Sequence, residues 1–276
     1  MHETPTIARV PVVGSPEPND HVDLWCFFYE SALRDHTLRR RYRELISSEE
    51  RERCERFVFE HDQVMSLATR TLVRTVLSHY AAVDPKAWRF ESDSRGKPFV
   101  SSPVEPRLWF NVSNTRGLVV CAVSQNHEKL GVDTEYIRRN VAAIELADRF
   151  FSRREATSLR AMPREHQCEH FFAYWTLKEC YVKARGLGLT VPLNAFSFVL
   201  DDTNIGIEFE QGLEDGVEHW RFALLRASSE HFIAVGIAGK SLPVIVRARK
   251  VVPLVSMEPF EPCSTIRPGV TLWRQS

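Results

Sequence analysis

Residues 131–135 read Gly-Val-Asp-Thr-Glu and place two carboxylates two positions apart in an otherwise apolar segment. In an extended chain the side chains alternate between faces, so Asp133 and Glu135 project from the same face. Two like charges this close destabilise the folded chain unless a positive group lies between them. The fold must therefore bring a positively charged group to this segment.

The composition limits the classes of protein to which the chain can belong. Its 276 residues are 43% hydrophobic, which is ordinary for a soluble globular protein. Lys plus Arg and Asp plus Glu both number 36, so the overall charge favours neither nucleic acid nor a membrane as partner. The six cysteines form no C-x-x-C pair, which disfavours a zinc ribbon or a disulfide framework. With no secretory signal and no apolar run of about 18 residues, we expect a cytoplasmic protein.

Local patterns predict the elements around this segment. Ser47 and Glu50 have capping-box spacing ahead of a helix, as do Ser152 and Glu155, and residues 62–82 show a helical apolar stripe. On that helix Arg70 and Arg74 are i,i+4 neighbours of like charge, which indicates either an anionic ligand or a solvated basic face. Residues 117–124 are strand-like.

The chain passes from that strand through a short polar loop, residues 125–129, directly into residues 130–135. This sequence of strand, loop and strand predicts a hairpin whose second strand carries the two carboxylates.

A second helix is predicted over residues 164–186, with Gly186 well placed to end it. On this helix Trp175, Glu179 and Lys183 are each four residues apart, so they share one face. Taken alone, the stripe could be an exposed salt bridge beside a core aromatic residue.

Together with the two carboxylates of the strand, the stripe predicts a specific chemistry. Three carboxylates suit Mg²⁺, and an ammonium beside them suits attack on a phosphoanhydride. The sequence contains no Walker loop, Rossmann glycine pattern or kinase motif, so a nucleotide would be held in some other way.

Five segments in this order resemble the 4'-phosphopantetheinyl transferases of the larger, surfactin-synthetase-activating type. They are Arg-Gly-Lys-Pro, Trp-Phe-Asn-Val-Ser-Asn, Gly-Val-Asp-Thr-Glu, Arg-Phe-Phe-Ser-Arg-Arg-Glu and the helix from Phe171 to Leu189. The resemblance spans roughly residues 45 to 240 and implies an α+β fold of two similar subdomains related by pseudo-twofold symmetry, with coenzyme A and Mg²⁺ in the cleft between them.

The expected boundaries are a lead over residues 1–20, subdomains over 21–127 and 128–245, and a C-terminal extension over 246–276. The lead carries four of the fifteen prolines and is expected to be disordered or to lie over the surface as a strap. The extension has no counterpart in the family pattern. Two subdomains in one chain make a monomer sufficient.

The reaction that the resemblance implies moves phosphopantetheine from coenzyme A to a serine of an acyl or peptidyl carrier protein and releases adenosine 3',5'-bisphosphate. Such enzymes serve fatty acid, polyketide and nonribosomal peptide biosynthesis. Position by position, the resemblance implies a metal site of Asp133, Glu135 and Glu179, with Glu179 or Glu135 as the base for the incoming serine. It implies that Lys183 stabilises the departing phosphate.

The resemblance also implies a coenzyme A pocket, whose expected members are His61, Arg70, Lys97, Pro98, Ser113, Asn114 and Lys183. Asn114 departs from the family, in which Ser-His is usual and the histidine binds the phosphates of coenzyme A. An amide can donate a hydrogen bond but cannot carry a positive charge. This departure is the only support for a rival hypothesis, a non-catalytic module that binds coenzyme A or a carrier protein. A third hypothesis is a different Mg-dependent nucleotide hydrolase.

Overall fold

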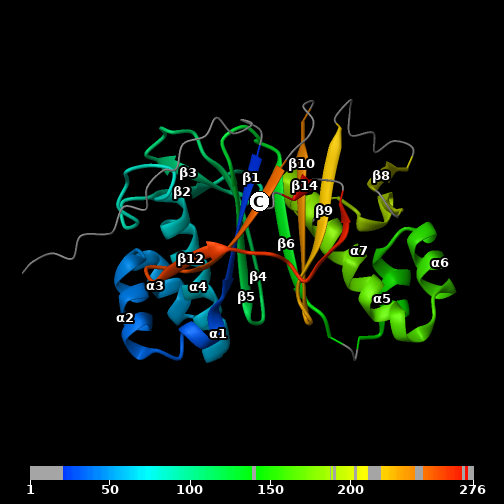
Figure 1. Ribbon diagram of the computed structural model, residues 1–276, viewed down its shortest axis with the longest axis horizontal. Helices are drawn as coiled ribbons and strands as arrows, with labels where there is room; N and C mark the ends of the chain where they lie inside the picture. The colour runs from blue at the N-terminus through cyan, green and yellow to red at the C-terminus, as the bar shows by residue number, and fades with distance from the viewer. Residues whose placement is uncertain are drawn as a thin grey trace, which may run out of the picture.

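A computed structural model describes residues 21–138, 141–186, 188, 191–201, 204–210, 219–239, 245–268 and 271–272, with the last two strands described by their backbone alone. The predicted lead over residues 1–20 lies outside these ranges. The fold is α+β, as expected: two antiparallel-rich sheets lie side by side at the centre, and helices cover their outer sides (Figure 1).

The helices gather in two groups, one on each side of the sheets (Figure 1). Those of the first group are α1 (Tyr29–Ala32), α2 (His36–Leu45), α3 (Ser48–Glu55) and α4 (Glu60–Leu77). Those of the second are α5 (Ala143–Phe150), α6 (Arg153–Ala161), α7 (Arg164–Arg185) and the 3₁₀ turn η2 (Leu193–Ala195). Within the described residues, no helix is both long enough and apolar enough to span a bilayer.

The first sheet has the strand order β12-β11-β1-β5-β4, with β14 beside β11. Its strands are β1 (His21–Phe28), β4 (Trp109–Thr115), β5 (Leu118–Ser124), β11 (Ile245–Val252), β12 (Ser256–Pro259) and β14 (Thr271–Leu272). The second sheet has the order β13-β9-β10-β6. Its strands are β6 (Leu130–Tyr136), β9 (Trp220–Ser228), β10 (His231–Ala238) and β13 (Ser264–Pro268). Two separate hairpins pair β2 (Arg89–Ser92) with β3 (Pro98–Ser102) and β7 (Phe196–Leu200) with β8 (Ile205–Phe209).

The local signals of the sequence form as predicted. Ser47 and Glu50 close a capping box at the start of α3, and Ser152 and Glu155 close another at the start of α6. Gly186 ends α7 with φ 63°, a left-handed conformation that glycine adopts without a Cβ clash.

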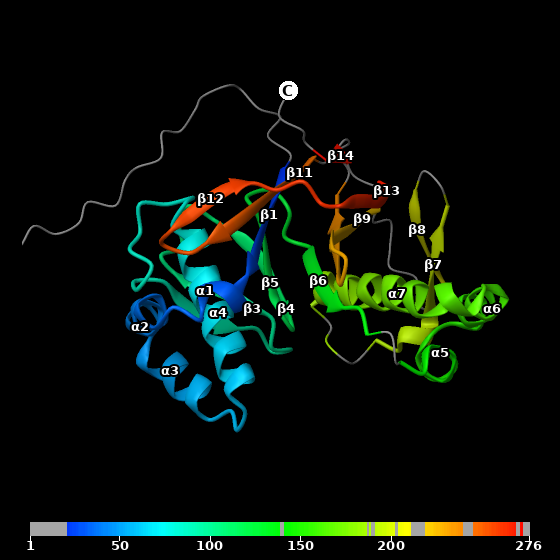
Figure 2. The same cartoon turned by 60° about the horizontal axis from the view of Figure 1, so that its bottom comes forward.

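The chain beyond residue 245 is part of both sheets (Figure 2). β11 pairs in parallel with β1 in the first sheet, and β13 pairs antiparallel with β9 in the second. An ion pair between the buried Asp23 of β1 and the half-buried Arg249 of β11 supports the first of these pairings. This segment therefore ties the two halves together at the backbone level.

The expectation that Arg74 faces a ligand or solvent is wrong, because Glu50 neutralises its charge. The guanidinium is buried, and its Nε lies 2.7 Å from Glu50 Oε2. Its Nη1 donates to the carbonyls of Pro85 at 2.8 Å and Trp88 at 3.1 Å. Arg74 thus connects α4 to α3 and to the loop that follows α4. Because Glu50 neutralises its charge, Arg74 does not repel Arg70 as an unpaired cation would.

The predicted hairpin between residues 117–124 and 130–135 is also wrong. β5 is already paired on both edges, with β1 on one side and β4 on the other. β6 therefore pairs antiparallel with β10 and becomes the edge of the second sheet that faces the first. The shared face of the two carboxylates follows from strand alternation and does not depend on the hairpin.

β6 meets the first sheet through the side chains of β4. Asn111 Oδ1 accepts a hydrogen bond from the backbone N–H of Val132 at 2.8 Å. Ser113 Oγ accepts one from the N–H of Thr134 at 3.3 Å. Thr115 Oγ1 accepts one from the N–H of Tyr136 at 3.1 Å. Successive side chains on one face of β4 thus take the place of a neighbouring strand's carbonyls, which satisfies buried donors at the junction.

We predict that Gly131→Ala destabilises the fold. A Cβ at Gly131 would overlap the carbonyl oxygen of Cys180 and lie 2.7 Å from the backbone nitrogen of Ala184. Helix α7 would have to move away from β6, at a cost of about 1–3 kcal/mol in the free energy of unfolding. Urea denaturation measures this loss. The matched control is Gly206→Ala, where the nearest atom lies 3.8 Å away, and an equal loss in both variants would contradict the close approach.

Candidate functional site

The close approach of α7 to β6 places Lys183 over the acidic face of the strand. Lys183 Nζ lies 2.6 Å from Asp133 Oδ1 and 2.7 Å from Ser113 Oγ. Ser113 in turn donates to the same carboxylate oxygen at 2.9 Å. Lys183 thus supplies the positive group that the two carboxylates require, and residues from β4, β6 and α7 form a cluster at the junction of the two sheets.

The ammonium of Lys183 is held in its charged form. Burial lowers its pKa, but the charge of Asp133, and more weakly that of Glu179, outweighs burial, so the pKa of Lys183 is raised above its ordinary value. Lys183 therefore pairs with a carboxylate on another element, Asp133 of β6, and does not depend on Glu179 of its own helix alone. The interpretation of this stripe as only an exposed salt bridge is wrong.

Two further carboxyl groups flank the buried Asp133. Burial, reinforced by the charge of Asp133, raises the pKa of Glu135 to about 7. Burial and the same charge raise the pKa of Glu179. The side chain of Trp175 also lies near Glu135 and lowers its pKa by a smaller amount, so the full helical stripe faces this strand. Three carboxyl groups thus share a single nearby ammonium, and the site favours an additional positive charge.

The donor set suits Mg²⁺ in its chemistry. Asp133 Oδ2 is buried and has no hydrogen-bond partner among the described residues, which is costly unless a ligand is bound. Carboxylate oxygens are the protein ligands that Mg²⁺ prefers, and it usually completes its octahedron with water and substrate phosphates. The side chains are not preassembled as a cage, since the described part of the chain has no group of three acidic, histidine or cysteine residues close enough to hold an ion.

The other residues expected in the nucleotide pocket do not converge with this cluster. Asn114 is exposed, on the face of β4 opposite Ser113. Lys97 Nζ donates to the backbone carbonyls of Leu130 and Ala184. Pro98, which begins β3, and Arg70, in the middle of α4, are half-buried.

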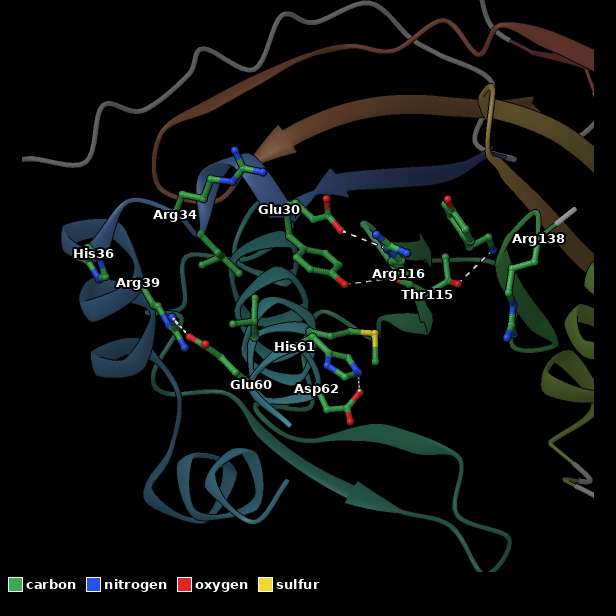
Figure 3. Close-up of a pocket in the computed structure, with 15 residues that line it drawn as sticks. Glu30, Arg34, His36, Arg39, Glu60, His61, Asp62, Thr115, Arg116 and Arg138 are labelled. Atoms are coloured by element: carbon green, nitrogen blue, oxygen red, sulfur yellow. Dashed lines mark hydrogen bonds and ion pairs between the residues drawn. The ribbon is translucent and has the colours of Figure 1, made fainter. Parts of the chain in front are cut away.

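His61 lies apart from the cluster, in a cleft of about 1220 Å³ (Figure 3). It is exposed in the first turn of α4, with its Nε2 3.3 Å from Asp62 Oδ1. α1, α2, the start of α4, the β4–β5 turn and the end of β6 line this cleft. Its lining includes Thr115 and Tyr136, the residues that follow Asn114 and Glu135 in the chain.

Sequence reasoning missed the arginines of this cleft. Arg34 and Arg39 come from neighbouring turns of the α1–α2 region, but Arg116 and Arg138 lie far from them in the chain, so no local pattern connects the four (Figure 3). Arg39 pairs with Glu60 at 2.8 Å, and Arg116 approaches Glu30 at 3.9 Å. The run of arginines at 39–41 was the only available signal, and it does not indicate which of them faces the cleft.

We predict that Glu135→Gln stabilises the metal-free protein at pH 8 and has little effect at pH 5. A carboxyl whose folded pKa is raised from 4.5 to about 7 favours the folded state fully below pH 4.5, and this contribution is lost as the pH rises through 7. The amide cannot ionise, so the gain in the free energy of unfolding at pH 8 should be about 1–3 kcal/mol. Urea denaturation at both pH values measures it, with the exposed Glu91→Gln as control; equal effects at both pH values would contradict the raised pKa.

Comparison with known proteins identifies the family. The family model described as the 4'-phosphopantetheinyl transferase superfamily matches residues 129–236, and the one described as 4'-phosphopantetheinyl transferase, N-terminal, matches residues 37–126. A 4'-phosphopantetheinyl transferase of Bacillus subtilis is 34% identical over 69% of this chain and 81% of its own length. The 4'-phosphopantetheinyl transferase Sfp of Bacillus subtilis is 35% identical over 61% and 73%, and HetI of Nostoc is 39% identical over 52% and 61%. This chain therefore belongs to the 4'-phosphopantetheinyl transferases, a family of enzymes.

Proposed function

We propose that this chain transfers the 4'-phosphopantetheine group of coenzyme A to a serine of an acyl or peptidyl carrier protein, with Mg²⁺, and releases adenosine 3',5'-bisphosphate. The names of its relatives support the transferred group. The observation that carries the proposal is the buried contact of Asp133 with Lys183 and Ser113, flanked by two carboxyl groups of raised pKa. A module that only binds would have no use for so many like charges in a half-buried site.

In the proposed reaction the serine oxygen of the carrier attacks the phosphorus next to pantetheine. A new P–O bond forms, and the bond to the bridging oxygen of the diphosphate breaks. The departing group, adenosine 3',5'-bisphosphate, keeps the electron pair and carries the developing negative charge. Lys183, which stays protonated beside Asp133, stabilises that charge in the transition state. Mg²⁺, held by Asp133, Glu135 and Glu179, would supply further neutralisation of the diphosphate.

The proton of the attacking serine needs an acceptor, and Glu135 and Glu179 are the two candidates. Both have a raised pKa in the metal-free chain, and a bound Mg²⁺ would lower it in both, so the two remain alternatives for this role. Asp133 is fully engaged on one oxygen by Lys183 and Ser113, which suits a ligand rather than a base. Glu179 lies one helical turn from Lys183 and shares the charge of the same site.

We also propose that residues 21–127 and 128–245 are two similar subdomains related by an approximate twofold axis. In each half a long helix packs across antiparallel strands: α4 lies on β5 and β4, and α7 lies on β6 and β10. The proposed site lies where the two halves meet, so a single chain would suffice for activity.

The test of the function is intact mass spectrometry of an unmodified acyl or peptidyl carrier protein after incubation with this chain, coenzyme A and Mg²⁺. We expect the carrier to gain one phosphopantetheine group and to stay unmodified in excess chelator. Free phosphopantetheine without a mass gain would identify a hydrolase instead. Binding of coenzyme A with no product would identify a binding module. Full transfer in excess chelator would show that the reaction does not need a metal.

We predict different failures for the two helix residues. Lys183→Ala removes a charge that matters most in the transition state, so kcat should fall about 10²–10³-fold while coenzyme A affinity weakens much less. Glu179→Gln keeps the shape but removes a metal charge, so coenzyme A should still bind while transfer nearly stops. Steady-state kinetics and calorimetry measure both, with the exposed Lys86→Ala as control. Near-normal rates in both variants would exclude this helix from catalysis.

Asn114 gives a separate prediction about the nucleotide. If Asn114 contacts the phosphates, Asn114→His should tighten coenzyme A binding, with the larger gain at low pH, where the imidazole is charged. Calorimetric titration with coenzyme A at pH 6 and pH 8 measures this difference. Weaker binding at both pH values would indicate that the pocket is shaped around the amide.

A further inference from the structure

Lys97 lies at the end of a tightly hydrogen-bonded turn between β2 and β3. Asp93 Oδ1 accepts hydrogen bonds from the N–H groups of Arg95 and Lys97, both at 2.9 Å. The N–H of Asp93 donates to the carbonyl of Lys97 at 3.0 Å, and Gly96 has a φ of 88°, which suits glycine. The turn therefore fixes the backbone from which the Lys97 side chain extends.

The ammonium of Lys97 reaches the other half of the molecule. Its Nζ donates to the carbonyl of Leu130, at the start of β6, at 3.3 Å and to the carbonyl of Ala184, in the last turn of α7, at 3.2 Å. Burial lowers the pKa of Lys97, as expected for an ammonium shielded from water. The stem of the side chain passes over Gly186, where an added Cβ would lie 3.2 Å from Lys97 Cδ.

The carbonyl of Ala184, in the last turn of α7, is positioned to benefit from this ammonium. The last four carbonyls of a helix lack partners within the helix, and the negative end of its dipole favours a cation. The same two elements touch at Gly131, whose missing side chain admits the backbone of Cys180 and Ala184. Lys97 thus fastens the end of α7 to the start of β6, beside their closest approach.

Lys183 precedes Ala184 directly, and Asp133 lies three residues beyond Leu130. We propose that Lys97 is a positioning residue: it holds the Lys183-bearing turn of α7 in register with the Asp133-bearing strand, and its ammonium is not an anchor for ligand phosphates. This inference rests on the proposed transfer reaction for its kinetic consequence. It changes the role that the resemblance implies for Lys97, which was that of a basic residue in the coenzyme A pocket.

The test compares Lys97→Met, which keeps the stem but removes the donors, with Lys97→Arg, which keeps donors and charge. Arg95→Met, on the exposed part of the same turn, is the matched control for loss of a positive charge. Three quantities are measured: kcat for transfer, the Kd of coenzyme A at low and high salt, and hydrogen exchange of residues 183–186 in the ligand-free protein.

For Lys97→Met we expect kcat to fall about 10- to 100-fold, because small displacements of catalytic groups have effects of this size. The Kd of coenzyme A should change less than about threefold and keep its salt dependence, since no phosphate contact is lost. Exchange of residues 183–186 should accelerate. Lys97→Arg should recover part of kcat and of the exchange protection, and Arg95→Met should match the wild type in all three quantities.

The opposite pattern would overturn the inference. A phosphate anchor predicts that Lys97→Met weakens coenzyme A binding more than tenfold, flattens its salt dependence and leaves exchange of residues 183–186 unchanged. If the wild-type chain transfers nothing, the proposed function fails. Hydrogen exchange still tests whether Lys97 holds the last turn of α7 against β6, because it is measured without substrate. If Lys97→Met does not fold, Lys97→Arg still decides, because the inference expects its exchange protection at residues 183–186 to fall below that of the wild type, while a phosphate anchor leaves that protection unchanged.

Discussion

Three side chains of β4 accept hydrogen bonds from the backbone of β6, and the meeting of the two sheets depends on them. Each bond satisfies an N–H group that has no strand partner on this side, where an unpaired buried donor would cost about 1–3 kcal/mol. Because the acceptors are side chains, their identity can serve a second purpose. Ser113 uses the same oxygen to hold β6, to bond Asp133 and to accept from Lys183. The structural junction and the proposed active site are thus one set of contacts.

The two adjacent charged residues of α7, Lys178 and Glu179, have opposite roles. Lys178 is fully buried, with its Nζ 2.8 Å from Glu155 and 2.6 Å from the carbonyls of Leu193 and Phe196. Glu155 also caps α6 and accepts from the N–H of Phe198 at 2.8 Å. Because each polar group in this network has a partner, the network holds α7 firmly against α6, η2 and β7. The face of α7 toward β6 carries Glu179, which lies near the carboxyl groups of Asp133 and Glu135. An additional cation there would reduce the repulsion among these three groups.

α7 is therefore held at three points around the proposed site. Lys178 holds its outer face, the absence of a side chain at Gly131 brings it against β6, and Lys97 fastens its last turn to the opposite half. The segment after residue 245 adds a backbone connection across both sheets. Such support matters for a reaction in which most of the rate comes from positioned charges, since displacements near 1 Å can lower it about 100-fold.

The sequence by itself determined the features that depend on neighbours within four residues. These are the capping boxes at Ser47 and Ser152, the end of α7 at Gly186, and the shared face of the two carboxylates in β6. Only the tertiary structure decided the partners. β6 pairs with β10 because both edges of β5 are occupied, and Lys97 bonds a carbonyl 87 residues away. Periodicity encodes which face a side chain occupies. The group opposite that face depends on long-range packing, which no spacing within a segment records.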